Sequence, residues 1–479
     1  MTSNIIKFVY QDQIIEVKNP DPNEILLNYI RTKLKKNGTK EGCAEGGCGA
    51  CTVVLGEYKD NKINYSSINS CIMFLPTLHR KQLILVEDLV SKNGSLHPVQ
   101  QAIVNYHGSQ CGFCTPGFVM SLFSMFKNYS KFNDDLIKNS ISGNLCRCTG
   151  YQPIIKAAKS LNNKNKADQF TKNEENIIKL LKKINNESII ICKKDKKYFA
   201  PRYVEELKKI LKKNINSYLL SGGTDLSLVV TKERKNIDSI IYMNSIDELN
   251  YIKNNNGYIE VGATTPLIKF ENYIKKYYSD FNSILKRYGS VQIRNTATLA
   301  GNIATASPIG DTLPLLLSLD AQVVLKSMKK TKVVPLNKFF IDYRKTKLKM
   351  GQFINSIRIP FFPENTFKAY KISKRFDDDI SSVCASFNLQ LINKKIKSIK
   401  IAYGGMASIP KRAKYCEKIL LNSPITDQII NKAKEALEQD FKPVSDMRAS
   451  AKYRMIVAKN LLHKCFLEIT HKKLIRLNK

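Results

Sequence analysis

The feature that most constrains this chain is the concentration of cysteines in its first third. Eight of the twelve cysteines lie between Cys43 and Cys148, in two groups. Such a density is typical of disulfide-bonded secreted domains or of metal sites. The amino-terminal residues lack the basic stretch and apolar core of a secretory signal, so we interpret the eight cysteines as metal ligands in an intracellular protein.

The spacing of the first group predicts a [2Fe-2S] cluster. Cys43, Cys48 and Cys51 follow the C-x4-C-x2-C pattern of plant-type clusters, and Cys71 would complete the ligands. Glycine allows positive φ angles and a close approach of backbone amides to sulfur. The loop contains Gly42, Gly46, Gly47 and Gly49. Four thiolates also suit zinc, but the glycine content and the x4 spacing disfavour it.

The second group consists of Cys111, Cys114, Cys146 and Cys148, and its chemistry alone leaves zinc and an iron–sulfur cluster open. The segments around it are QCGFCTPG at 110–117 and GNLCRCTGY at 143–151. They resemble the second cluster domain of the xanthine dehydrogenase/aldehyde oxidase family. EGCAEGGCGAC at 41–51 is similar to the family's first cluster loop. The resemblance implies two [2Fe-2S] clusters held by all eight cysteines, with Gln110 beside the second.

Two segments rich in glycine and hydroxyl residues resemble the family's FAD-binding domain. By itself the first, which follows a strand-like run at 218–220, is an ordinary turn. The second segment, at 289–303, suits a close-packed cofactor pocket, and the resemblance implies that both segments hold FAD. The implied FAD-binding residues are Ser221, Gly222, Gly223, Thr224, Asp225, Leu226, Tyr288, Thr298, Gly301, Asn302, Thr305, Ser307, Asp311 and Lys371.

Lys371, with residues 374–375 and 378–380, resembles the family segment beside the flavin where nicotinamide access is controlled. Without that resemblance the segment is a solvated run of charges. No G-x-G-x-x-G follows a predicted strand, so NAD would dock on the flavin domain instead of a Rossmann fold. We expect no catalytic acid or base in this chain, because flavin chemistry needs only that the cofactors be positioned and tuned.

The length of 479 residues predicts several domains. Together with the resemblance, the patterns indicate a multidomain α+β protein: a ferredoxin-like β-grasp [2Fe-2S] domain, a helical-bundle [2Fe-2S] domain, an α/β FAD-binding domain and a C-terminal α+β flavin-side domain. The expected boundaries are 1–88, 89–161, a linker at 162–187, 188–365 and 366–479. Local patterns predict a hairpin at 5–17, a helix that starts at 21–24, and helices that open at Thr115, at Asn133 and at about Asp427.

The formal net charge of +36 raises the possibility of a nucleic-acid partner. Lysines are spread along the whole chain without a basic arm or a nucleic-acid-binding motif, which favours a solvated lysine-rich surface. No window approaches the roughly 18 uncharged apolar residues of a membrane span. We therefore expect a soluble, cytoplasmic protein.

The resemblance implies an electron-transfer subunit of a xanthine dehydrogenase-type molybdenum hydroxylase. No molybdopterin domain is found before Lys479, so the molybdopterin would lie on a partner large subunit, in a dimer of heterodimers. Electrons from purine oxidation would pass through the Cys111 group, then the Cys43 group, then FAD, to NAD⁺. The alternatives are the equivalent subunit of an aldehyde or N-heterocycle hydroxylase and, more remotely, a basic nucleic-acid-binding protein.

Overall fold

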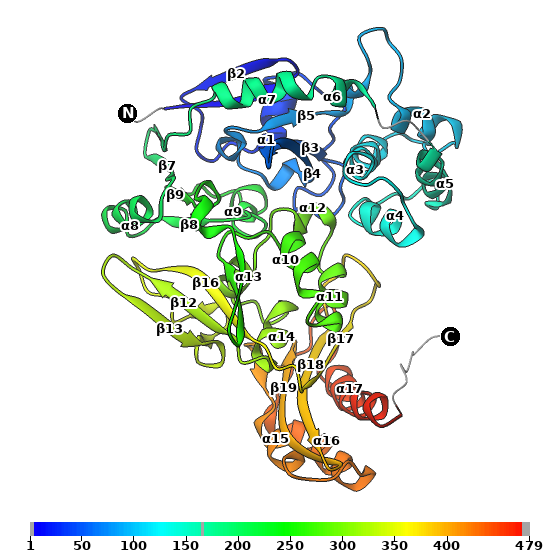
Figure 1. Ribbon diagram of the computed structural model, residues 1–479, viewed down its shortest axis with the longest axis vertical. Coiled ribbons are helices and arrows are strands. Elements are labelled where there is room, and N and C mark those ends of the chain that lie inside the picture. Colours follow the sequence, from blue (N-terminus) through cyan, green and yellow to red (C-terminus); the bar gives the residue numbers. More distant parts are fainter. Residues whose placement is uncertain (1–3, 164–166, 472–479) are drawn as a thin grey trace. The chain divides into compact units, whose positions relative to one another are not determined.

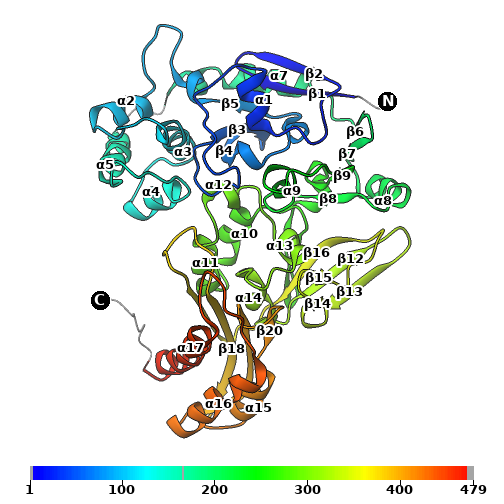
Figure 2. The same cartoon turned by 180° about the vertical axis from the view of Figure 1, so that it is seen from behind.

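The computed structural model describes residues 4–163 and 167–471 (Figures 1 and 2). The chain divides into two compact units. The first comprises Met1–Asp247 and Gly289–Ala297, and the second comprises Glu248–Tyr288 and Thr298–Lys479. A short segment inside the predicted flavin domain thus belongs to the unit that carries all eight clustered cysteines.

The first unit begins with a mixed five-stranded sheet in the order β2-β1-β5-β3-β4, in which only β1 and β5 are parallel. Alternate residues of each strand face opposite sides, so Phe8 and Val9 enter two different hydrophobic cores. The elements are β1 (Ile5–Tyr10), β2 (Gln13–Lys18), α1 (Leu26–Thr32), β3 (Thr52–Lys59), β4 (Lys62–Asn69) and β5 (Gln82–Ile84).

The predicted start of the first helix at residues 21–24 is wrong. The Asp21 carboxylate accepts a hydrogen bond from the Asn23 amide, and the Glu24 amide donates to the Asp21 carbonyl. These bonds form a turn, because a short acidic side chain that bonds its own backbone competes with helix formation. Helix α1 therefore begins only at Leu26.

Four helices form the second part of the first unit and cover the Val9 side of the sheet. The Asn133 side chain accepts from the Leu136 amide and caps α4, as its sequence predicts. The helix α3 is buried over most of its length and supplies Phe118 and Phe123 to the core. The helices are α2 (Pro98–Asn105), α3 (Thr115–Asn128), α4 (Asp134–Ile141) and α5 (Gln152–Ser160).

The segment after the helical part is tied to it by a buried network. Helices α6 (Gln169–Lys172) and α7 (Glu174–Lys183) follow. His97 Nε2 lies 3.1 Å from the Asp168 carboxylate, and the Lys127 ammonium lies 2.8 Å from it. Burial alone would raise the pKa of Asp168, but the hydrogen bonds from His97 and Lys127 hold it well below its usual value.

A second, four-stranded sheet completes the first unit in the order β6-β7-β9-β8. Its apolar face joins the Phe8 core, to which it contributes Tyr198 and Ile240. The elements are β6 (Ile189–Lys193), β7 (Lys196–Ala200), α8 (Val204–Lys213), β8 (Tyr218–Leu220), α9 (Ser227–Thr231), β9 (Ser239–Tyr242) and α12 (Val291–Arg294).

The second unit contains an antiparallel sheet in the order β10-β11-β16-β12-β13, and four of its helices lie between β11 and β12 in the chain. The elements are β10 (Ile252–Asn255), β11 (Tyr258–Gly262), α10 (Leu267–Ile274), α11 (Ser279–Lys286), α13 (Leu299–Thr305), α14 (Thr312–Ser318), β12 (Gln322–Lys326), β13 (Thr331–Pro335), β14 (Phe340–Asp342), β15 (Lys345–Thr346) and β16 (Phe353–Pro360).

The carboxyl-terminal part of the second unit packs three helices against a sheet in the order β17-β18-β19-β20. Its core joins strand residues such as Phe387 and Ile401 to helix residues such as Leu437 and Leu462. The elements are β17 (Thr366–Ile372), β18 (Val383–Ile392), β19 (Lys395–Gly404), β20 (Lys411–Arg412), α15 (Lys414–Leu420), α16 (Asp427–Asp440) and α17 (Ala451–His471).

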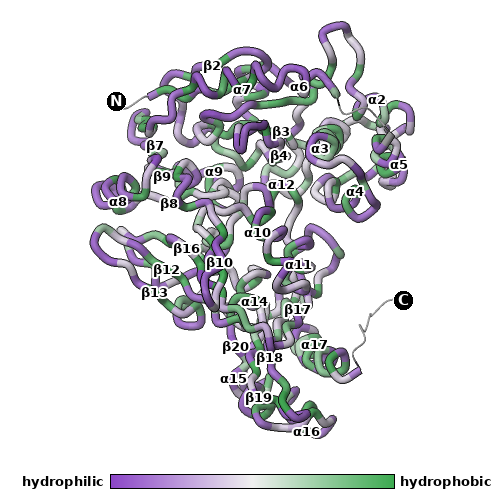
Figure 3. The backbone as a smooth tube through the Cα atoms, in the orientation of Figure 1, coloured by the Kyte–Doolittle hydropathy of each residue, from purple (hydrophilic) through white to green (hydrophobic). Residues whose placement is uncertain are grey.

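Hydrophilic segments recur in every part of the chain in Figure 3 rather than in one region. The lysine-rich faces of α7 and α8 are examples. This distribution fits a solvated basic surface better than a single nucleic-acid-binding arm. Within the described residues, no helix is long and apolar enough to cross a membrane.

Candidate cofactor sites

The first group of thiols comes together in the first unit. Cys43 and Cys48 lie on the loop before β3, Cys51 directly precedes β3, and Cys71 lies in the 3-10 turn Ser70–Ile72. The neighbouring thiols of Cys48 and Cys71 lower the pKa of Cys43, and the thiol of Cys71 lowers that of Cys51. The same neighbours, Cys43 and Cys51, raise the pKa of Cys71. The four sulfur atoms therefore share one small volume.

Backbone amides of the loop point at one of these sulfurs. The amides of Gly47 and Glu45 donate to Cys43 Sγ at 3.3 and 3.5 Å. Gly46 and Gly49 have φ angles of 77° and 70°, as a loop wrapped around a cluster requires. Ala44 also adopts a positive φ, 54°, which its side chain did not predict.

The second group of thiols pairs in the helical part. The sulfurs of Cys111 and Cys148 are 3.6 Å apart, and Cys114 hydrogen-bonds Cys146. Cys111 and Cys148 are exposed. Thr149 donates to Cys146 Sγ from its hydroxyl at 3.2 Å and from its amide at 3.5 Å.

The arrangement of both groups fits dinuclear clusters. Each group provides two thiol pairs, and each iron of a [2Fe-2S] cluster takes two thiolates besides the bridging sulfides. Hydrogen bonds from amides and a hydroxyl to the sulfurs are the kind of contact that tunes cluster potentials.

The two cluster loops are in direct contact. The Leu145 amide donates to the Cys48 carbonyl at 3.0 Å. A Cβ atom added to Gly49 would lie 2.2 Å from the Gly143 carbonyl oxygen. Only glycine at position 49 allows the two loop backbones to approach so closely.

The first segment expected to hold FAD lies beside the first thiol group. Gly223 has a φ of 77°, and a Cβ added to Gly222 would lie 2.1 Å from the Thr296 carbonyl. The Ser227 hydroxyl donates to the carbonyl of Ile72, the residue after Cys71, at 2.7 Å. Residues 221–224 and Leu226 are half-buried and Asp225 is exposed. A backbone turned this tightly suits a cofactor that packs against main chain.

The other residues expected to hold FAD lie in the second unit, where hydrogen bonds join several of them. The Asn302 side chain donates to the Tyr288 hydroxyl at 3.0 Å and accepts from Thr312 at 2.5 Å. Thr298 caps α13 by accepting from the Gly301 amide at 3.0 Å. Thr305 and Ser307, at the end of that helix, are half-buried. These half-buried hydroxyl and amide groups are the types that hold a ribityl chain.

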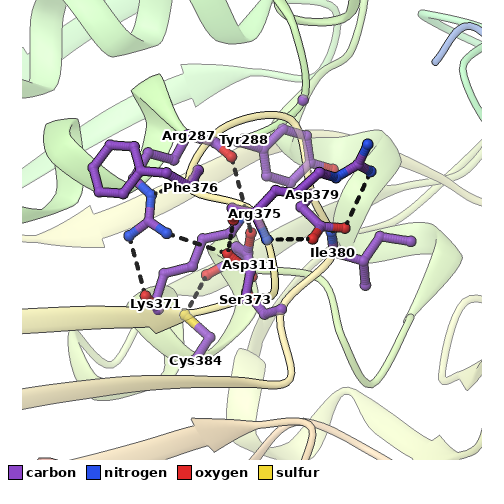
Figure 4. A network of polar contacts seen from close by, with 12 residues as sticks. Arg287, Tyr288, Asp311, Lys371, Ser373, Arg375, Phe376, Asp379, Ile380 and Cys384 are labelled. Atoms are coloured by element: carbon purple, nitrogen blue, oxygen red, sulfur yellow. Dashed lines mark hydrogen bonds and ion pairs between the residues drawn. The ribbon is translucent and has the colours of Figure 1, made fainter. Parts of the chain in front are cut away.

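Lys371 and Asp311 form a buried ion pair with 2.7 Å between Nζ and Oδ2 (Figure 4). The Lys371 ammonium also donates to the Arg287 carbonyl, and the Ser381 hydroxyl donates to the other Asp311 oxygen. A buried lysine needs such partners whether or not a cofactor binds. Lys371 is therefore a structural residue of this site in its own right.

The loop after Lys371 is fastened by Arg287, a residue that the sequence analysis missed. The Arg287 guanidinium donates to the carbonyls of Phe376 and Lys371 and to the Ser373 hydroxyl, and lies 4.3 Å from the centre of the Phe376 ring (Figure 4). Nothing in the local sequence of Arg287 connects it to a loop more than eighty residues away.

The sequence also gave no sign of where residues 291–294 would lie. The hydroxyl-rich segment from 289 suggested a cofactor pocket, yet Gln292 and Arg294 are buried among the cluster domains. The Arg294 guanidinium donates to the Gly289 carbonyl and to Asn139 of α4. A buried arginine with partners on another domain cannot be told from a surface arginine by its sequence position.

Four domain families match successive parts of the chain. A 2Fe-2S iron-sulfur cluster binding domain matches residues 8–75, and a [2Fe-2S] binding domain matches 85–159. The FAD binding domain in molybdopterin dehydrogenase matches 193–362, and the CO dehydrogenase flavoprotein C-terminal domain matches 368–469. The chain belongs to the molybdenum hydroxylase family. It is a multidomain α+β member with two [2Fe-2S] domains and an FAD-binding domain.

Among curated molybdenum hydroxylases, the xanthine dehydrogenase of Emericella nidulans is 32% identical over 91% of this chain and 36% of its own length. The chain thus spans little more than a third of that relative. A carbon monoxide dehydrogenase from Hydrogenophaga pseudoflava matches 55% of this chain and 93% of its own chain at 24% identity, with a TM-score of 0.53. Quinoline 2-oxidoreductase from Pseudomonas putida 86 matches 58% of this chain and 98% of its own chain at 20% identity, with a TM-score of 0.54. These two structures share the fold.

Proposed function

We propose that this chain is the electron-transfer subunit of a xanthine dehydrogenase. In this role it takes electrons from a molybdopterin-binding large subunit during purine oxidation and passes them through two [2Fe-2S] clusters and FAD to NAD⁺. The observation that carries the proposal is the pairing of both thiol groups within one compact unit, beside the first flavin segment. The similarity to curated xanthine dehydrogenases supports purine as the substrate class.

The exposure of the two thiol groups supports the direction of electron flow. Cys111 and Cys148 reach the surface, and Phe113 and Leu145 beside them are 48% and 43% exposed. An exposed cluster with apolar neighbours suits a site that a partner protein covers. We therefore infer that electrons enter at the second group, and that Gln110 and its neighbours meet the large subunit.

The first thiol group suits transfer to the flavin. Cys51 and Cys71 are only 1% and 3% exposed, and the Ser227–Ile72 hydrogen bond joins the backbone next to Cys71 to the first segment expected to hold FAD. Bound FAD would supply the exchange between single electrons and a hydride, which NAD⁺ requires. In this role, the residues of this chain hold the cofactors, donate hydrogen bonds to the cysteine sulfurs and exclude water.

The expected NAD site is the flavin-side surface near Lys371. The loop 373–380 is exposed at Phe376, whose ring stacks on Arg287. A stacked guanidinium and ring offer a flat, partly cationic surface of the kind that accepts an aromatic ring and a phosphate. We propose that this loop controls access of nicotinamide to the flavin.

The test begins with iron, zinc and flavin analysis of the purified chain, followed by EPR spectra before and after reduction with dithionite. We expect two distinct [2Fe-2S] signals and one FAD per chain. Zinc in place of iron, or a folded chain without flavin, would overturn the electron-transfer role.

The acceptor and substrate need separate measurements. Anaerobic NADH should bleach the flavin and then reduce both clusters, whereas a chain that NADH leaves oxidised does not use NAD. Reconstitution with a molybdopterin subunit should give NAD-dependent oxidation of hypoxanthine or xanthine. Oxidation of aldehydes or N-heterocycles instead of purines would assign the chain to another molybdenum hydroxylase.

A further inference from the structure

Gln292 is a buried amide from the flavin-binding sequence that inserts between the two cluster loops of the first unit. Its side chain is 1% exposed. Its Nε2 lies 3.1–3.2 Å from three oxygens, on Thr52, Ser121 and Asn144. Thr52 begins the strand that directly follows Cys51, Ser121 lies on the helix that directly follows Cys114, and Asn144 lies in the loop two residues before Cys146.

The partners of Gln292 bond one another as well. Ser121 donates to Asn144 Oδ1 at 2.7 Å, and Thr52 donates to the Gly49 carbonyl at 2.6 Å. Asn144 Nδ2 donates to the same Gly49 carbonyl at 3.1 Å. The network therefore crosses from the loop of the first thiol group to the loop of the second, with Gln292 bonded to both sides.

The network lies where the two loops approach most closely. Gly49 is the residue between Cys48 and Cys51 that touches Gly143, three residues before Cys146. A Cβ added to Gly143 would lie 2.5 Å from Gln292 Oε1. The oxygen end of the Gln292 amide therefore packs against the Gly143 backbone, although Oε1 has no hydrogen-bond partner among the described residues.

We propose that Gln292 is a positioning residue for electron transfer between the two clusters. Its amide fixes the distance and orientation of the cluster loops and touches no cluster ligand itself. This inference rests on the proposed electron-transfer function. Because the junction is buried, removing the amide takes the Nε2 donor away from the oxygens of Thr52, Ser121 and Asn144, which water does not reach. We therefore expect the junction to shift.

The experiment compares Gln292→Met, which keeps the length of the side chain but removes its hydrogen bonds, with the unaltered chain. A second, milder variant is Ser121→Ala, which removes one arm of the network. The control is Asn282→Leu in the second unit, where a buried amide bonded to the Glu271 carbonyl at 2.8 Å is lost instead. Iron content, cluster potentials and melting temperature are measured for each purified, cofactor-loaded protein.

The readouts that a purely structural role would not change are the spin–spin splitting between the two reduced clusters and the rate at which a single injected electron moves between them. The splitting is measured by EPR and the rate by pulse radiolysis. We expect Gln292→Met to keep both clusters at their potentials but to narrow the splitting and slow the transfer roughly tenfold, since small misplacements have large effects on rate. Ser121→Ala should also narrow the splitting and slow the transfer, but by a smaller amount than Gln292→Met.

Asn282→Leu should lower the melting temperature and leave splitting and rate unchanged. Unchanged splitting and rate in both network variants, with full iron content, would overturn the positioning role. Loss of iron in both variants would also overturn it, because the amide would then serve cluster assembly. If the unaltered chain lacks iron–sulfur signals, the proposed function itself fails, which the first spectrum reveals.

Discussion

The two thiol groups that we expect to hold the clusters consist of four cysteines each but lie in opposite surroundings. The first has two buried members, Cys51 and Cys71, and receives hydrogen bonds from backbone amides of a glycine-rich loop. The second has two exposed members, Cys111 and Cys148, and a hydroxyl donor from Thr149. A site buried in a sheet domain is part of the fold of that domain, whereas a site at the surface can lose a ligand with a smaller loss of stability.

The largest expected difference between the sites is the effect of deleting one ligand. Cys71→Ala should abolish the first cluster signal and destabilise the sheet domain, because metal binding there is part of folding. Cys148→Ala should abolish the second signal with a smaller fall in melting temperature. EPR and thermal unfolding measure both effects, and Cys192→Ala, at an exposed cysteine outside both groups, is the control.

Equal losses of stability in the two ligand variants would contradict the assignment of the first site as the structural one. A first cluster signal that survives Cys71→Ala would remove that cysteine from the ligands.

The next largest difference concerns glycine-to-alanine substitutions, which should lower the stability of the two sites by different amounts. Gly49→Ala should destabilise the chain by about 3 kcal/mol or more, because the new Cβ clashes with backbone in addition to the cost of a positive φ. Gly112→Ala meets open space and should cost only the about 1–2 kcal/mol of a left-handed residue. Denaturant unfolding measures both.

Gly94→Ala, also at a positive φ in open space but away from either cluster, gives the conformational cost alone. If Gly49→Ala cost no more than Gly94→Ala, the loops would not be in close contact.

Acid should weaken the two cluster domains in different pH ranges. Burial lowers the pKa of His79 from 6.5 to about 4, and the cations Arg80, Arg202 and Lys7 add to this. Between pH 6.5 and 4, the unfolded chain therefore binds a proton at His79 that the folded chain does not bind. The neutral, buried His79 contributes up to about 3 kcal/mol to the free energy of unfolding above pH 6.5, and this contribution is lost as the pH falls towards 4. The lowered pKa of Asp168 has its effect only below its usual value of 3.8.

Hydrogen exchange resolved by domain, measured from pH 7.5 to 4, should show the sheet domain weakening first. His79→Asn, whose side chain can accept the bond that the Lys7 amide donates to Nδ1, should flatten this dependence. An unchanged pH dependence in that variant would show that His79 is not the group responsible.

The smallest expected effect concerns the potential of the second cluster. Thr149→Val removes a hydroxyl donor to Cys146 Sγ but keeps the amide donor. A hydrogen bond favours the reduced, more negative cluster, so its loss should lower the reduction potential by tens of mV, equivalent to about 1 kcal/mol. Thr149→Ser, which keeps the hydroxyl, should restore it in an EPR redox titration.

A shift in the first cluster's potential instead of the second would reverse the assignment of the two signals. Equal potentials in the valine and serine variants would exclude the hydroxyl as the tuning group.

Local patterns predicted many elements of the fold correctly. The hairpin at the amino terminus, the helix opening at Thr115, the cap at Asn133 and the helix opening at Asp427 all depend on residues close in sequence. The helix predicted from Asp21 failed because that side chain bonds its own turn and also the ammonium of Lys196, which lies far away in sequence. Local signals cannot include such a partner.

The sequence by itself determined which cofactor-binding domains this chain contains. The spacing of the eight cysteines and the flanking motifs predicted the two [2Fe-2S] domains, because ligand geometry around a cluster is imposed within short loops. The assignment of each cysteine as a ligand stays a prediction. Only the tertiary structure decided that Gln292 enters the junction of the cluster loops and that Arg287 fastens the Lys371 loop. Those contacts join residues that are distant in sequence, and packing selects them through burial and hydrogen-bond satisfaction that no local pattern records.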